Sequence, residues 1–74
     1  MSILAQQSLA ILVNGEPRRV SAGVNITQML AELGLDPQRV AVERNRDVVP
    51  RSSLGEVMVE DGDQYEMVHF VGGG

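Results

Sequence analysis

Residues 9–34, LAILVNGEPRRVSAGVNITQMLAELG, contain the elements that decide the fold. Leu9–Val13 is a continuous apolar run of β-favouring residues, and Asn14-Gly15 follows it directly. Both turn residues tolerate a positive φ, so this dipeptide after such a run predicts a β-hairpin. The returning strand of the hairpin is expected over Pro17–Ser21.

A helix is predicted immediately after the hairpin. Asn25 suits the N-cap position, because its side chain can accept a hydrogen bond from an unpaired N–H of the first turn. Gly34 follows the helix in the C′ position, and Pro37 prevents its continuation. Apolar residues recur at the i, i+3, i+4, i+7 spacing of one helix face, namely Ile26, Met29, Leu30 and Leu33.

The second half of the chain predicts two further strands joined by short elements. Val40–Val42 is expected to form the third strand, and Tyr65–Val71 a long final strand. Between them, Val48-Val49 is a short extended piece that Pro50 stops, and Asp61-Gly62-Asp63 predicts a turn.

The predicted core lies between the helix and one face of the sheet. Leu54 is expected to reach it from a single helical turn capped by Ser52 or Ser53. Side chains alternate along a strand, so every second strand residue faces the core. The complete predicted core is Leu9, Ile11, Val13, Ile26, Met29, Leu30, Leu33, Val40, Val42, Leu54, Tyr65 and Met67.

This order of elements predicts an α+β fold. The last strand is covered at both edges if it pairs with the first and the third, with a right-handed connection through the helix. That arrangement is the β-grasp (ubiquitin-like) fold, a mixed sheet of four to five strands packed on one main helix, although other small α+β sheets fit the order too. Residues 9–71 are predicted to form the domain, residues 1–8 a loosely ordered N-terminal extension, and residues 72–74 a flexible glycine tail.

Composition excludes several classes of function. The chain of 74 residues has a net charge of −4, no cysteine and no lysine. A thiolate metal site, a cysteine nucleophile and a lysine Schiff base are therefore excluded. An acidic chain with two aromatic residues, Tyr65 and Phe70, also lacks the basic and stacking surface of a nucleic-acid-binding protein. No apolar run reaches the ~20 residues of a membrane span, and we expect a cytoplasmic protein.

Two further groups of residues receive structural interpretations. His69 has no second histidine or cysteine beside it, and Asp61-Gly62-Asp63 lacks the ligand loop of a calcium site, so no metal site is predicted. The scattered arginines, including Arg51, are interpreted as a solvated surface, with binding of an acidic partner as the alternative.

The three terminal glycines can enter a narrow active site. Extended, Gly72–Gly74 reaches roughly 10 Å beyond the last strand. The terminal carboxylate, with an ordinary pKa of about 3.3–3.7, is ionised at neutral pH and is a poor electrophile until it is activated, for example as an acyl-adenylate. A glycine-rich end is by itself a weak motif and also fits a frayed terminus.

Five short pieces, in the right order and spacing, carry a family resemblance. They are Val13-Asn14-Gly15-Glu16, Val40-Ala41-Val42-Glu43-Arg44-Asn45, Val49-Pro50-Arg51, Asp61-Gly62-Asp63 and Phe70-Val71-Gly72-Gly73-Gly74. Together they resemble the sulfur carrier family of thiamine biosynthesis, ThiS, over nearly the whole chain. Arg46 stands where many family members have glycine, so Asn45 is expected to supply the positive φ of that turn.

The resemblance implies a specific chemistry at the C-terminus. An E1-like adenylating enzyme would use ATP to adenylate Gly74, and sulfur from a cysteine desulfurase or another persulfide donor would convert it to a thiocarboxylate for thiazole synthase. Gly73 and Gly72 would give the tail its access. The chain would then be a protein co-substrate and not an enzyme, with no permanently bound cofactor, and a monomer when free.

Other functions share these features and remain as alternatives. The small subunit of molybdopterin synthase has the same fold and diglycine end. A ubiquitin-like modifier would form isopeptide bonds with lysines of other proteins, and a non-covalent interaction module would not need its glycine tail.

Alternation along the last strand also predicts a docking surface. If Tyr65 and Met67 face the helix, Val68 and Phe70 lie on the opposite face. Leu12, on the outward side of the first strand, is expected to extend this apolar patch. Such a patch beside the tail indicates a partner surface, unless the first residues fold over it.

Overall fold

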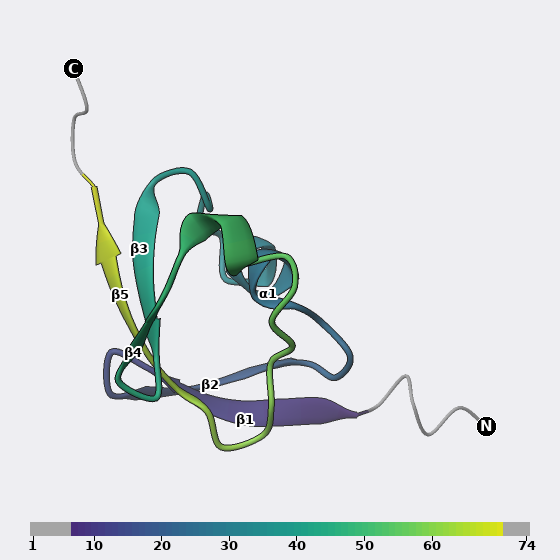
Figure 1. Cartoon of the computed structure of the whole chain (residues 1–74). Helices are drawn as coiled ribbons and strands as arrows, with labels where there is room; N and C mark the ends of the chain where they lie inside the picture. The colour runs from purple at the N-terminus through teal and green to yellow at the C-terminus, as the bar shows by residue number, and fades with distance from the viewer. Residues whose placement is uncertain (1–6, 71–74) are drawn as a thin grey trace.

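Among residues 7–70, which the computed structural model describes, five strands form one mixed sheet with an α-helix across one face (Figure 1). The helix α1 spans Ile26–Glu32, and a short 3₁₀ helix, η2, spans Arg51–Ser53. The strands are β1 (Ser8–Val13), β2 (Glu16–Ser21), β3 (Val40–Arg44), β4 (Asp47–Val49) and β5 (Gln64–His69).

The last strand lies in the centre of the sheet. The strand order is β2-β1-β5-β3-β4, so β5 separates the hairpin β1–β2 from the hairpin β3–β4. It pairs in parallel with β1 and antiparallel with β3. This confirms the predicted pairing of the last strand with the first and third, and with it the β-grasp fold.

The predicted helix boundaries are confirmed by their capping contacts. The Asn25 side chain accepts a hydrogen bond from the Gln28 N–H at 2.8 Å, and the Gln28 side chain accepts one from the Asn25 N–H at 2.9 Å. This reciprocal pair is a capping box. At the other end, Gly34 has a φ of +78°, which is the left-handed conformation expected at C′.

Both hairpins turn through two residues with positive φ. Asn14 and Gly15 have φ values of 51° and 82°, as predicted. In the second hairpin Asn45 has a φ of 51°, but Arg46 also adopts a positive φ, of 75°. The expectation that Asn45 alone would meet this need is wrong, because a two-residue hairpin of this geometry needs positive φ at both central positions.

The core forms where it was predicted, with changes at its rim. Leu9 and Leu33 are only half-buried, while two unpredicted valines, Val20 and Val59, are buried. Val20 pairs with Leu9 across the hairpin and so faces the helix, and the Val59 N–H donates to the Val24 carbonyl at 3.0 Å. The buried apolar residues are Ile11, Val13, Val20, Ile26, Met29, Leu30, Val40, Val42, Leu54, Val59, Tyr65 and Met67.

The segment around η2 begins earlier than predicted. Pro50 precedes the 3₁₀ helix and no side chain caps it, so neither Ser52 nor Ser53 is the N-cap. The fixed φ of Pro50 already sets the chain direction at this point. Leu54 follows the helix and is buried, as expected.

The predicted ends of the domain are partly outside the described residues. Strand β1 begins at Ser8, one residue before the predicted domain, and β5 ends at His69. Residues 1–6 and 71–74 lie outside the described residues. They include most of the predicted extension and the whole glycine tail. None of the helices in residues 7–70 is long and apolar enough to cross a bilayer.

Truncating the helix core should destabilise the fold. Leu30 is 0% exposed at the centre of the interface, so Leu30→Ala is expected to lower the free energy of unfolding by about 2–5 kcal/mol. Leu33→Ala is the matched control and should cost less, because Leu33 is half-buried. Urea denaturation measures both, and equal losses would contradict the placement of the core.

Candidate functional site

The end of β5 is the part of the described structure closest in sequence to the predicted reactive tail. On one side, His69 lies opposite Val40 of β3, and the Phe70 N–H donates to the Arg39 carbonyl at 2.8 Å. On the other side, β1 pairs only with Gln64 and Tyr65 of β5. The strand therefore runs past the end of β1 and leads to the tail from the edge of the fold (Figure 1).

A buried carboxylate holds the beginning of β5. Asp63, which is 5% exposed, accepts four hydrogen bonds that come from different segments. Its donors are Arg44 Nε at 2.9 Å, the Tyr65 hydroxyl at 2.8 Å, Asn45 Nδ2 at 3.2 Å and the Glu60 N–H at 2.9 Å. This carboxylate therefore ties the turn before β5 to the end of β3.

The contacts of Asp63 determine its charge. Burial alone would raise the pKa of the Asp63 carboxyl, but the hydrogen bonds from Glu60, Tyr65, Arg44 and Asn45 outweigh it and hold the pKa below the ordinary 3.8. Burial, and then the bond to Asp63, raise the pKa of the Tyr65 phenol, so it stays a neutral donor. The cluster is an ionised carboxylate held by neutral and cationic donors. These contacts stabilise the fold.

The other carboxylate of this turn also has a structural partner. Asp61 accepts a hydrogen bond from the Ala10 N–H at 2.8 Å, and the Gly62 N–H donates to the Ala10 carbonyl at 2.7 Å. The turn thus continues the pairing of β1 beyond the start of β5, and the turn interpretation of Asp61-Gly62-Asp63 is confirmed. Among residues 7–70, no three histidine, aspartate or glutamate side chains gather to hold a metal ion.

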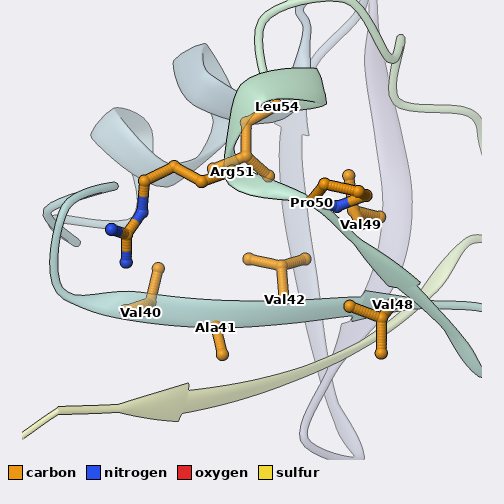
Figure 2. A pocket seen from close by; sticks show the side chains of 8 residues that line it. All are labelled: Val40, Ala41, Val42, Val48, Val49, Pro50, Arg51 and Leu54. Carbon is orange, nitrogen blue, oxygen red and sulfur yellow. The ribbon is translucent and has the colours of Figure 1, made fainter.

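Apolar side chains lie on part of the face of the sheet opposite α1, toward the end of β5. Val68 and Phe70 lie on this face, 63% and 46% exposed, as alternation predicted. Ala41, opposite Val68 on β3, and Val48 on β4, 72% exposed, belong to it as well. Figure 2 shows Ala41 and Val48 pointing away from the side of the sheet on which Leu54 lies. We call Ala41, Val48, Val68 and Phe70 the outer patch.

Leu12 does not extend the outer patch. It is half-buried and lies opposite Gln64, four residues along β5 from Val68. At about 3.3 Å per residue, this is roughly 13 Å away. The exposed side chains of Gln64 and Glu66 lie between them. The parallel register of β1 and β5, which alternation alone does not specify, separates Leu12 from the predicted docking surface.

A shallow apolar groove of about 190 Å³ runs between β3 and η2 (Figure 2). It opens because β4 stops pairing with β3 at Val42. The exposed Arg51 side chain extends along the groove toward Val40. The groove is lined by Val40, Ala41, Val42, Val48, Val49, Pro50, Arg51 and Leu54.

The arginines do not form one basic patch. Arg44 is committed to Asp63 and lies 3.7 Å from Glu60, and Arg39 lies 3.8 Å from Asp36. Arg18 and Arg19 lie on the edge strand β2, at the other side of the sheet from β3 and β4.

Comparison with known proteins assigns the family. Residues 11–74 match the model of the ThiS family. This range includes β5, the outer patch and the glycine tail. The chain belongs to the ThiS family. A solved structure of the ThiS protein from Geobacter metallireducens covers 89% of this chain and 100% of its own, with 35% sequence identity and a TM-score of 0.74.

Curated relatives of this ThiS-family chain include a protein of similar size and two much longer ones. The sulfur carrier protein ThiS of Bacillus subtilis is 43% identical over 49 residues, which cover 66% of this chain and 74% of that protein. A thiazole synthase of Paramagnetospirillum magneticum is 48% identical over 66 residues, 89% of this chain. The chain spans about a fifth of the length of this thiazole synthase and of a similar one from Magnetococcus marinus.

Three features of this site were not among the predictions from the sequence. Nothing local marks Asp63 as buried, since Asp-Gly-Asp reads as an exposed turn. Asn14 and Asn45 were assigned to turns, but their side chains also bond to the backbone of β5. Ala41 had a usable signal, because alternation along Val40–Val42 already places it opposite to the core.

Neutralising Asp63 should weaken the fold in a pH-dependent manner. Asp63→Asn removes an ionised acceptor of four hydrogen bonds and is expected to cost about 1.5–3 kcal/mol at neutral pH. The pKa of Asp63 is lowered by folding, so its contribution is complete above the ordinary pKa of 3.8 and is lost as the pH falls through the lower folded value. The difference between wild type and variant should therefore shrink below about pH 4.

Urea unfolding at several pH values between 7 and 2 measures this difference. Asp47→Asn is the control, because Asp47 is exposed at the start of β4, and it should change stability by less than about 0.5 kcal/mol. A difference between wild type and Asp63→Asn that stays constant down to pH 2 would contradict the assigned role of the charge.

Proposed function

We propose that this ThiS-family chain is a sulfur carrier whose Gly74 carboxylate is adenylated and converted to a thiocarboxylate for thiazole formation in thiamine biosynthesis. The observation that carries the proposal is the placement of β5, which is held in the centre of the sheet and leaves it at Phe70, four residues before Gly74. The family match continues through residue 74. In this role the chain is a protein co-substrate and not an enzyme.

The proposed chemistry has three steps, the first of which activates the carboxylate on a partner enzyme. The Gly74 carboxylate attacks the α-phosphorus of ATP, and pyrophosphate leaves to give an acyl-adenylate. A persulfide sulfur then attacks the acyl carbon and AMP leaves. A thiol reduces the resulting acyl disulfide, is itself oxidised to a disulfide, and releases the thiocarboxylate. This chain supplies access and docking, and ATP is held by the E1-like adenylating enzyme.

The relatives favour thiazole formation over the alternatives. In two organisms, a segment about half identical to this chain is part of a longer protein named thiazole synthase. The presence of such a segment within a thiazole synthase supports a role in the same pathway as that enzyme. It favours this role over that of the small subunit of molybdopterin synthase. The remaining proposed partner is a cysteine desulfurase or another persulfide donor. A cytoplasmic location and a monomeric free state stay predictions.

We assign the outer patch as the docking surface for the adenylating enzyme and thiazole synthase. Val68, on β5, and Phe70, directly after its end, are exposed apolar side chains on the stretch that leads to the tail. An exposed apolar cluster on a small domain indicates a contact surface. A partner that covers this patch therefore has the start of the tail within its reach.

Deleting Gly74 should abolish adenylation. The deletion leaves a glycine carboxylate about 3.3–3.6 Å too far back to meet the nucleotide, and an error of about 1 Å already costs roughly a hundredfold in rate. ATP–pyrophosphate exchange with the E1-like enzyme measures the first step, and intact mass after adding a sulfur donor measures the second. Gly72→Ala is the control and should be tolerated better than Gly73→Ala.

Full activity without Gly74 would overturn the sulfur-carrier proposal and support the non-covalent module. Intact mass of the protein purified from its host also distinguishes the alternatives, because a thiocarboxylate replaces one oxygen by sulfur. Isopeptide-linked conjugates of the chain would support the ubiquitin-like modifier instead.

Phe70→Ala should weaken docking but leave stability nearly unchanged. Phe70 is 46% exposed on the outer patch, so its truncation removes contact area from the partner more than from the core. Binding to the adenylating enzyme by calorimetry and thermal unfolding measure the two effects. Leu12→Ala is the matched control outside the patch and should leave binding unchanged. Lost stability with unchanged binding for Phe70→Ala would show that Phe70 packs within the fold.

A further inference from the structure

The side chain of Asn14 takes the place of a strand residue beside β5. Its Nδ2 donates to the Met67 carbonyl at 3.1 Å, and its Oδ1 accepts from the Met67 N–H at 2.7 Å. The Asn14 backbone N–H donates to the Tyr65 carbonyl at 2.8 Å. The carboxamide thus continues the β1–β5 ladder by one residue after β1 itself has ended at Val13.

The local chemistry of this position favours asparagine. The hairpin turn holds Asn14 at a φ of 51°, a region that asparagine and glycine tolerate. Glycine would accept the turn but has no side chain to reach Met67. Aspartate would keep the acceptor for the Met67 N–H but would place a second oxygen against the Met67 carbonyl. Asparagine therefore satisfies the turn and the strand together.

Beyond Met67, β5 is held on one side. The Phe70 N–H still donates to the Arg39 carbonyl, and Val68 still pairs with Ala41 of β3. On the β1 side, the pair formed by Asn14 and Met67 is the last contact of the strand ladder within residues 7–70. About 10 Å of strand, from Met67 to Phe70, follows this contact.

We propose that Asn14 is a positioning residue for the carrier tail. By bonding both backbone groups of Met67, it fixes the direction in which the chain leaves the sheet, and with it the start of the tail relative to the outer patch. This inference rests on the proposed function, since the group to be placed is the Gly74 carboxylate. Reaction requires near-attack geometry to within about 1 Å, so a loosened strand end lowers the rate of adenylation more than the strength of docking.

Asn45 provides a matched control at the opposite end of β5. It occupies the other hairpin turn with the same φ of 51°. Its Oδ1 accepts from the Gln64 N–H at 2.9 Å, and its Nδ2 donates to Asp63 at 3.2 Å. Each asparagine therefore makes two side-chain hydrogen bonds, but those of Asn45 hold the start of the strand and those of Asn14 hold the end next to the tail.

The test compares Asn14→Gly with Asn45→Gly. Glycine tolerates the positive φ of both turns, so each change removes the side-chain hydrogen bonds without backbone strain. Three quantities are measured: the melting temperature, the amide hydrogen exchange of Phe70, and kcat and KM for ATP–pyrophosphate exchange with the full-length carrier as substrate.

We expect both variants to lose several degrees of melting temperature, as the loss of two hydrogen bonds implies. In Asn14→Gly alone, the Phe70 amide should exchange about tenfold faster, and kcat should fall by about tenfold or more with KM nearly unchanged. Asn45→Gly should leave Phe70 exchange and kcat at wild-type values.

Equal behaviour of the two variants in Phe70 exchange and kcat would overturn the proposal, because Asn14 would then act on stability alone. A rise in KM with unchanged kcat would overturn it as well and would place Asn14 in docking. If wild type itself shows no adenylation, the sulfur-carrier proposal fails, and the Phe70 exchange comparison alone decides whether Asn14 holds the strand end.

Discussion

The structure depends on holding one strand between two hairpins that do not pair with each other. β5 comes last in the chain but lies in the middle of the sheet, with β1–β2 on one side and β3–β4 on the other. Its ladder with β1 is only two residue pairs long. Side chains lengthen it: Asp61 bonds to Ala10 at one end, and Asn14 bonds to Met67 at the other. On the β3 side, Asp63 and Asn45 secure the start of β5. Polar side chains therefore reinforce the sheet at both ends of β5.

This construction places the functional features on the same strand. Odd residues of β5, such as Tyr65 and Met67, fill the core, while Val68 and Phe70 form part of the outer patch. The same strand then leads to the glycine tail. Under the proposed function, recognition through the patch therefore takes place on the same stretch of chain that leads to the reactive end. The buried Asp63 carboxylate, in contrast, serves the stability of the fold, because all four of its hydrogen bonds hold neighbouring segments together.

Most of the fold and the family of the chain could be predicted from the sequence. The Asn14-Gly15 turn, the Asn25 cap and the apolar spacing of α1 are each specified by residues close together in the chain. The same holds for the outward orientation of Val68 and Phe70, which follows from the alternation of a single strand. The boundary of η2 and the conformation of Arg46 were missed, since Pro50 and the hairpin geometry override the preferences of the individual residues.

By itself, the sequence determined the local elements, their order and the glycine end, because these depend on periodicity, turn residues and capping between near neighbours. Only the tertiary structure decided which side chains meet across β5. Asn14 and Met67 lie 53 positions apart, and they meet because the parallel register brings Asn14 beside the stretch of β5 between Tyr65 and Met67. The same register places Leu12 beside Gln64 and away from Val68. Burial of Asp63 likewise needs Arg44 and Tyr65 in position. Strand register between distant segments is a property of the packed sheet, and no local pattern encodes it.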